Sequence, residues 1–273
     1  MSAFTDAVEK VASALENNSK KFEELDSVAG DGDLGITAGN IAKGLRSGAA
    51  GATGDLKADL MLIGREIAKF APSTFGTLFA TGFIRASAAV TDADALKNTQ
   101  LAVTGAYEGI AARGKAALGE RTLLDALHPA SVALNAATDL QTGLNAAAAG
   151  ARAGVVATAS MAPKHGRAGW IGERAQGNED AGATVVAVVG RIGVRHGFQT
   201  FGGLVDHVLE EPRQRSVNRL VEGIEVEDRL RVLHRCRRLY SLWWRRHRLN
   251  HIRHAPRFFR LVGNRYHAGH ADN

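Results

Sequence analysis

The sequence predicts an all-α protein, and three observations carry that prediction. Up to about residue 185, apolar residues recur at helical spacing, alanine is abundant, and alternating strand patterns are nearly absent. Apolar residues three and four positions apart line one face of a helix. Alanine has the highest helix propensity, and small side chains allow helices to approach closely. We therefore expect a helical bundle whose functional loops lie at the helix ends.

The expected elements follow from these patterns in chain order. Near the N-terminus, an apolar stripe is formed by Phe4, Val8, Val11 and Leu15. A second stripe, which we expect to be buried, is formed by Leu56, Leu60, Ile63, Ile67 and Phe70. The alanine-dense stretch Leu144–Ala153 favours a further helix. Loops are predicted where glycine, proline and asparagine gather, at Gly30–Gly35, Pro72–Gly76 and Gly172–Gly182.

Length and composition exclude several classes of protein. The 273 residues suffice for one large domain or a domain with an appendage. No run of apolar residues is long enough for a membrane span, and no secretory signal is visible at the N-terminus. The single cysteine, Cys236, excludes an intrachain disulfide and a cysteine-built metal site. We expect a cytoplasmic protein without a membrane partner.

The formal net charge of +6 conceals two compositional regimes. Lys164 is the last lysine, and eight of the ten histidines lie beyond residue 190. The earlier part is rich in Ala, Gly, Asp and Glu. We therefore predict a domain at residues 1–189 and an atypical Arg/His-rich tail at residues 190–273.

The tail allows three interpretations. Leu204 and Val208, and then Leu220 and Ile224, hint at short helices, and Arg229–Arg260 is crowded with arginine, histidine and aromatic residues. Such a segment is typical of a nucleic-acid arm, but also of a solvated basic face. We favour a third interpretation, an altered-frame or read-through extension, because lysine is absent. We expect the tail to contribute nothing to the functional site and do not expect nucleic acid as a partner.

The densest candidate site is the segment Asp26–Gly35, which carries Asp26, Asp31 and Asp33 between glycines. Glycine allows sharp turns, and carboxylates this close together repel one another unless a cation is present. Their hard oxygen ligands suit magnesium bridging to phosphate. A solvated acidic turn is the alternative, since Asp and Gly are common in turns.

Three familiar motifs are imitated in the sequence and fail. The glycine spacing of Gly30–Gly35 matches a dinucleotide fingerprint, but no buried strand precedes it. A calcium loop starting at Asp31 lacks the required glycine and glutamate. The near P-loop Gly109–Ala116 ends on Ala116, which has no hydroxyl for magnesium. None of the three is retained.

Five motifs in a fixed order over residues 1 to about 187 resemble the dihydroxyacetone-kinase L-type domain family. They are Leu25–Gly35; Ser73–Thr77; Arg113–Lys115 together with Gly119–Leu127; Gly166–Arg174; and Asp180–Ala183. The resemblance implies an antiparallel barrel of about eight helices with the nucleotide held by loops at one end. Two positions depart from the family pattern, Leu34 where histidine is frequent and Ala181 where proline is usual.

The resemblance also implies site residues. Asp26, Asp31 and Asp33 match the ligands of two magnesium ions. The positions that match nucleotide contacts are Leu34, Gly35, Thr37, Ser73, Thr74, Gly114, Leu123, Arg167, Asp180, Ala181 and Gly182. Arginine suits bidentate phosphate contacts, and a hydroxyl such as that of Ser73 also caps helices. No catalytic side chain is assigned.

The function implied is magnesium-dependent phosphoryl transfer from an adenine nucleotide, either ATP or a tightly held ADP that is first rephosphorylated, to dihydroxyacetone or a related short-chain ketose. The ketose would be bound by a separate K-type subunit, and a phosphotransferase-system protein is a further candidate phosphoryl donor. We also expect a homodimer. The chemistry agrees, because phosphoryl transfer requires mainly positioning and charge neutralisation. The alternatives are a nucleotide-binding regulatory module without turnover, and nucleic-acid binding through the tail.

Overall fold

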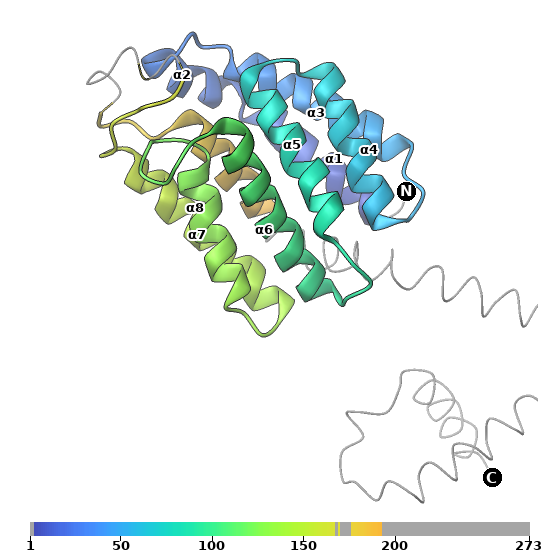
Figure 1. Ribbon diagram of the computed structural model, residues 1–273. Helices are drawn as coiled ribbons and strands as arrows, with labels where there is room; N and C mark the ends of the chain where they lie inside the picture. Colours follow the sequence, from blue (N-terminus) through green and yellow to red (C-terminus); the bar gives the residue numbers. More distant parts are fainter. Residues whose placement is uncertain (1–2, 167–168, 170–175, 193–273) are drawn as a thin grey trace, which may run out of the picture. The chain divides into compact units, whose positions relative to one another are not determined.

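The computed structural model describes residues 3–166, 169 and 176–192, and within these ranges the chain is helical with no strand (Figure 1). No helix of the described part is long and apolar enough to cross a membrane. A final helical segment covers residues 181–192. The preceding helices are α1 (Ala3–Asn17), α2 (Ser19–Ala29), α3 (Leu34–Ala50), α4 (Leu56–Phe70), α5 (Thr74–Ala89), α6 (Ala95–Gly114), α7 (Leu124–Asn135) and α8 (Leu140–Thr158).

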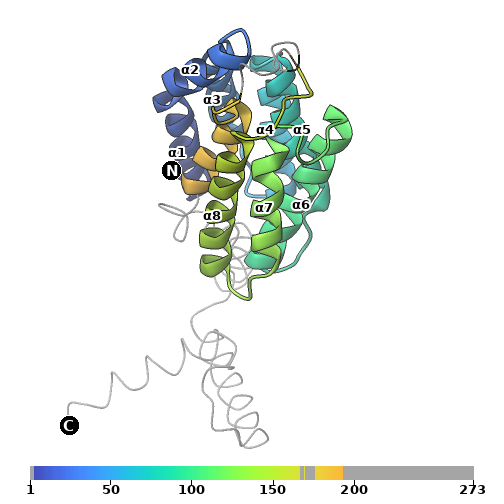
Figure 2. The ribbon, with the colours of Figure 1, turned by 90° about the vertical axis from the view of Figure 1, so that its left-hand side faces the viewer.

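The helices form a closed ring. Helix α1 packs against α3, and from α3 to α8 each helix packs against the next. Segment 181–192 closes the ring between α8 and α1 (Figure 2), because its Val185 lies in the same buried cluster as Phe4 of α1. On its other side, Ala183 shares a cluster with Val155 of α8. The predicted antiparallel helical barrel is confirmed.

Side-chain caps start four of the helices. Asp55, Ser73, Asp94 and Asp139 each precede a helix and accept a hydrogen bond from the backbone N–H three residues later, over 2.7, 3.1, 2.8 and 2.9 Å respectively. Each such cap satisfies one of the N–H groups that a helix start leaves without a partner and contributes about 1 kcal/mol. The loop residues of the sequence therefore determine where the helices begin.

The apolar stripes pack largely as predicted. In α4, Ile63 and Ile67 are fully buried, whereas Leu60 is half-buried. The prediction was wrong for Phe70, the last residue of the helix, which is 42% exposed. Helices α3 and α4 approach very closely, since a Cβ at Gly44 would lie 2.6 Å from the Cα of Ile67.

Because neighbours in the ring run in opposite directions, the connecting loops gather at two ends. The aspartate end comprises residues 30–33, 71–73, 115–123 and the described part of 159–180. The opposite end comprises residues 51–55, 90–94 and 136–139. Helices α3, α5, α7 and segment 181–192 all begin at the aspartate end, so four helix N-termini with their partial positive charge face the same region.

The predictions for the tail, including its short helices and its basic segment Arg229–Arg260, lie outside the described residues, which end at residue 192. The predicted domain boundary at 189 stays a prediction.

Candidate functional site

The three aspartates form a compact group at the aspartate end. Asp26, in the last turn of α2, and the loop residues Asp31 and Asp33 each offer a carboxylate oxygen, and these oxygens lie within 4.8 Å of one another. Asp26 is half-buried, whereas the other two are exposed. Three carboxylates at this spacing supply the oxygen ligands that a hard divalent cation prefers, so the donor set fits magnesium.

Backbone geometry holds the aspartates in place. Leu34 donates its N–H to Asp26 Oδ2 over 3.3 Å, which ties the end of α2 to the start of α3. Gly32 has φ +76°, a conformation that favours glycine, and a Cβ at Gly30 would collide with the Asp26 carboxylate. The glycines of the motif are therefore required by the turn that brings the three carboxylates together.

The aspartate group carries unfavourable electrostatics. Burial raises the pKa of Asp26 above its ordinary value, and the negative charges of Asp31 and Asp33 raise it further, against the lowering effect of the Leu34 N–H. Mutual repulsion of this kind destabilises the folded protein and is relieved when a cation binds. The arrangement is suited to metal binding rather than to stabilising the fold.

Two helix starts meet beside the aspartates. Thr37, in the first turn of α3, donates its hydroxyl to Ser73 Oγ over 3.2 Å, and Ser73 caps α5. Helix N-termini attract anions because their first N–H groups lack intrahelical acceptors. The capping role proposed for Ser73 is confirmed, and Thr74 is exposed at the next position. This pair of helix starts is suited to phosphate oxygens.

Leu34 and Gly35 occupy the same helix start but contribute backbone only. The Leu34 side chain is buried in the main core, so it does not take the place of a polar side chain in the site. Gly35 is buried against α2, where a Cβ would lie 2.6 Å from the Ser19 carbonyl oxygen. Neither residue offers a side chain to a ligand, and the Leu34 N–H already donates to Asp26 Oδ2.

Gly114, at the end of α6, and Leu123, directly before α7, lie close to Leu78 of α5. A Cβ at Gly114 would be 3.4 Å from Leu78 of α5, and Leu78 packs in the cluster that contains the buried Leu123. The two residues, which are nine positions apart in sequence, thus approach the same apolar surface near the start of α5. Such a surface is suited to a nucleoside rather than to phosphate.

The segment Asp180–Gly182 lies against Phe75, in the first turn of α5. A Cβ at Gly182 would be 3.1 Å from the Phe75 ring, which leaves no spare room there. Asp180 caps segment 181–192 by accepting the Ala183 N–H over 2.7 Å, and its own N–H donates to Thr158 Oγ1 over 2.8 Å. Burial raises the pKa of Asp180 to about 6, with smaller contributions from Asp125 and Asp26. Asp180 lies at the same end of the ring as Asp26, whose negative charge also raises its pKa.

Arg167, the remaining predicted contact, lies outside the described residues. Among the described ones, the structure brings the predicted positions together at one end of the ring. The sequence reasoning assigned no role to Glu120, Arg121 and Asp125, although it quoted them within a motif.

These three residues organise the loop 115–123. Asp125 is buried and accepts the N–H groups of Gly119 and Thr122 over 2.6 and 2.8 Å. Glu120 accepts the Ala117 N–H over 2.7 Å and pairs with His165 at 2.5 Å, and the pKa of its carboxyl is lowered to about 2, mainly by the Ala117 N–H and then by His165. The signal available in the sequence was the charged residues Glu120, Arg121 and Asp125 on either side of the apolar pair Leu123–Leu124.

Comparison with known proteins decides the family. The DAK2 domain matches residues 28–192, more than half of the chain. The chain belongs to the DAK2 domain family. The chain is 33% identical to D-erythrulose kinase of Mycolicibacterium smegmatis over 194 residues, which are 68% of this chain and 33% of that protein. It thus spans about a third of the length of the first curated relatives it matches.

A shorter relative matches along most of its length. The chain is 32% identical over 177 residues to the ADP-binding subunit DhaL of PEP-dependent dihydroxyacetone kinase 1 from Listeria innocua, covering 62% of this chain and 83% of that subunit. Among solved structures, dihydroxyacetone kinase from C. freundii in complex with AMP-PNP and Mg²⁺ superimposes with a TM-score of 0.58 at 26% identity. That match covers 70% of this chain and 33% of the other.

Proposed function

We propose that this DAK2 domain binds a magnesium–adenine nucleotide at the aspartate end and transfers a phosphoryl group to dihydroxyacetone or a related short-chain ketose. The observation that carries the proposal is the position of three carboxylates, with oxygens within 4.8 Å of one another, directly before the start of α3. The names of the relatives, which are kinases of dihydroxyacetone and erythrulose, support the same reaction.

The chain's own residues would divide the work. Asp26, Asp31 and Asp33 would hold the metal, for which we propose two ions; magnesium would neutralise the charge on the phosphates. The N–H groups at the starts of α3 and α5, with the Thr37 and Ser73 hydroxyls, would orient the phosphate oxygens. Gly114 and Leu123 would flank the nucleoside, and Arg167 with Asp180–Gly182 would close the site. Positioning and electrostatic stabilisation are what this reaction requires of a protein.

The acceptor and the source of phosphate belong to the same proposal. We propose that the ketose is held by a separate K-type subunit, since one relative of similar extent is itself named a subunit. The nucleotide would be exchangeable ATP, or a retained ADP rephosphorylated by a phosphotransferase-system protein. A cytoplasmic homodimer with the domain at residues 1–189 and no role for the tail completes the proposal.

Titration calorimetry with ATP tests the binding step. The wild-type chain should bind ATP in the presence of magnesium and lose most of that affinity when the metal is chelated, and Asp31→Asn should reproduce the loss. Unchanged ATP affinity in Asp31→Asn with magnesium would remove the metal assignment. Coupled assays with a K-type subunit and dihydroxyacetone then test turnover; binding without turnover would instead identify a regulatory module.

A further inference from the structure

Arg121 is the most unusual charged residue of the described part. Its side chain is only 4% exposed, and its backbone has φ 57°, in the left-handed region. One guanidinium nitrogen, Nη2, donates to the Asn178 carbonyl oxygen over 3.1 Å. Within the described part of the chain, the other two nitrogens, Nε and Nη1, have no hydrogen-bond partner.

Such a residue does not stabilise the fold by itself. Burying donors without acceptors costs about 1 to 3 kcal/mol for each group, and more where the group is charged. A left-handed conformation in a residue other than glycine costs on the order of 1 kcal/mol as well. A single hydrogen bond to Asn178 is too weak to offset both. The contribution of Arg121 must therefore be sought in its charge and in the loop that it touches.

The charge of Arg121 acts on Asp180 and lowers its pKa, against the effect of burial. The pKa of Asp180 is influenced by Arg121 from the loop before α7, by Asp125 from the first turn of α7 and by Asp26 from α2, and Arg121 is the cation of this set. The carboxylate of Asp125 already accepts the N–H groups of Gly119 and Thr122. Next to Asp180, Glu179 is paired at the surface with Arg152 of α8 at 2.6 Å.

Arg121 thus holds residues 178–182 at two points. Its Nη2 fixes the backbone at Asn178, and its charge attracts the carboxylate that caps segment 181–192. The same loop 115–123 ends at Leu123, whose buried side chain contacts the cluster beside the start of α5. The cation of Arg121 therefore connects the loop 115–123 with residues 178–182, two parts of the site that are distant in sequence.

We propose that Arg121 is a positioning residue of the nucleotide site, which acts through Asp180 and holds residues 178–182 against the loop 115–123. The proposal rests on the proposed function, because the two parts of the site matter only when a nucleotide lies between them. The proposal assigns Arg121 a role in nucleotide binding and none in stabilising the fold. The two orphaned nitrogens predict that the residue costs stability while it supports affinity.

Two substitutions and a matched control test this. Arg121→Met in the full chain should weaken magnesium–ATP binding by about tenfold or more while leaving the melting temperature unchanged or raised. Arg121→Lys, which keeps the charge without the planar fork, should recover part of the affinity. Arg152→Met removes an exposed arginine that holds the same segment at Glu179, and it should change affinity by less than about twofold. A lowered melting temperature with unchanged affinity in Arg121→Met would show a purely structural role and overturn the inference.

A double-mutant cycle tests whether Arg121 acts through Asp180. In an Asp180→Asn background, which keeps a capping side chain, Arg121→Met should cause little further loss of ATP affinity. Losses that multiply would show independent action and overturn the inference. If the wild type itself failed to bind magnesium–ATP, the proposed function would fall together with the inference. If the wild type bound and Arg121→Met bound equally well, only the inference would fall.

Discussion

The two ends of the helical ring use the same polar residue types in opposite ways. At the opposite end, Asp59 is 1% exposed and accepts hydrogen bonds from the Thr53 and Gly54 N–H groups over 2.7 and 3.0 Å. Asn98, equally buried, accepts the Thr91 N–H over 2.9 Å and donates to the Ala93 carbonyl over 2.7 Å. At the aspartate end, Asp125 is satisfied in the same way, but Asp26, Asp31 and Asp33 lie close together, and two nitrogens of Arg121 have no partner in the described part of the chain.

The difference separates stability from function. Buried polar groups that are fully satisfied hold loops in one conformation, whereas clustered like charges and orphaned donors cost free energy. Energetic conflict of this kind persists where a ligand resolves it. The opposite end therefore stabilises the ring, whereas the aspartate end has the energetic features expected of a binding site.

The largest expected effect concerns the metal ligands. Asp33→Asn should weaken magnesium–ATP binding by about 3 kcal/mol or more, roughly a hundredfold, because one ligand charge beside the phosphates is lost. Without magnesium, the same variant should unfold at an equal or higher temperature, since repulsion at the site falls. Calorimetric titration and thermal melts with and without the metal measure both. A clear drop in the melting temperature of Asp33→Asn without metal would contradict the proposed difference between the two ends of the ring.

The matched change at the opposite end should act in the reverse sense. Asp59→Asn keeps the shape but removes a buried charge that accepts from Thr53 and Gly54, so the free energy of unfolding should fall by about 2 to 3 kcal/mol. Magnesium–ATP affinity should stay within about twofold. Urea unfolding measures the change in stability, and titration calorimetry measures the affinity. Loss of affinity together with stability would show that the two ends are coupled.

The pH dependence of stability reports on the environment of Asp180. Because the pKa of Asp180 is raised to about 6, the folded state binds a proton more tightly than the unfolded state. Below about pH 4, Asp180 is protonated in both states and its raised pKa does not affect stability. As pH rises from there through 6, the free energy of unfolding falls by on the order of 1 to 3 kcal/mol, because ionising the buried carboxyl is costly. Asp180→Asn should remove it, as the difference between two melting profiles from pH 4 to 7 would show. Parallel profiles would contradict the burial of this carboxyl.

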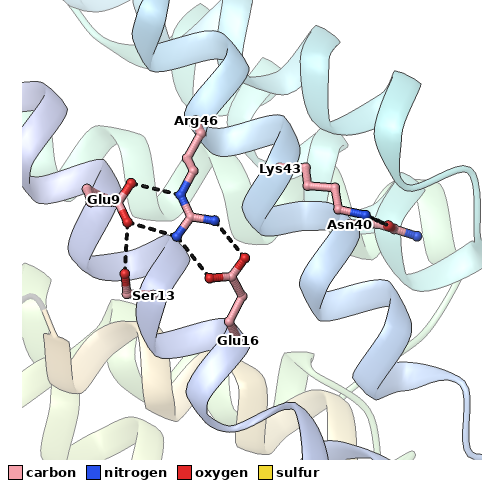
Figure 3. A network of polar contacts seen from close by, with 6 residues as sticks. All are labelled: Glu9, Ser13, Glu16, Asn40, Lys43 and Arg46. Carbon is pink, nitrogen blue, oxygen red and sulfur yellow. Dashed lines mark hydrogen bonds and ion pairs between the residues drawn. The ribbon is translucent and has the colours of Figure 1, made fainter.

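A smaller effect is expected for a network that belongs to neither end (Figure 3). Arg46 of α3 forks between Glu9 and Glu16 of α1, with contacts of 2.8 and 2.6 Å. All three side chains are partly exposed, so Arg46→Met should cost about 1 kcal/mol or less. Thermal melts at low and high salt measure it, and the loss should shrink at high salt. A loss of several kcal/mol would mean that charges on the sides of the ring matter as much as its ends.

The smallest effect is expected from the tail. Segment 181–192 ends the described part, and Ile192 packs against the main core, so we expect truncation after Ile192 to leave the ring intact. Magnesium–ATP affinity should change by less than about twofold, below half a kcal/mol. If truncation unfolds the domain or abolishes binding, the boundary proposed at residue 189 is wrong. A steep salt dependence of nucleic-acid binding, confined to the full chain, would instead support a role for the basic residues.

Local patterns in the sequence determined the helical class, the positions of several helix starts and the identity of the aspartate triad. These features depend on short-range physics. Helical spacing determines which face is buried, capping residues such as Ser73 and Asp139 satisfy nearby N–H groups, and glycine permits the turn at Gly32. The one clear error in the stripes, Phe70, shows that spacing does not reveal where a helix leaves the core.

Only the tertiary structure decided how distant residues meet. The hydrogen bond between Thr37 and Ser73, the burial of Arg121 against residue 178, and the raised pKa of Asp180 join segments far apart in sequence. Desolvation and charge coupling arise from the packing of whole helices, so no local pattern could have predicted them. The sequence by itself therefore determined which groups could bind a metal–nucleotide, and the closure of the ring decided which charges surround them.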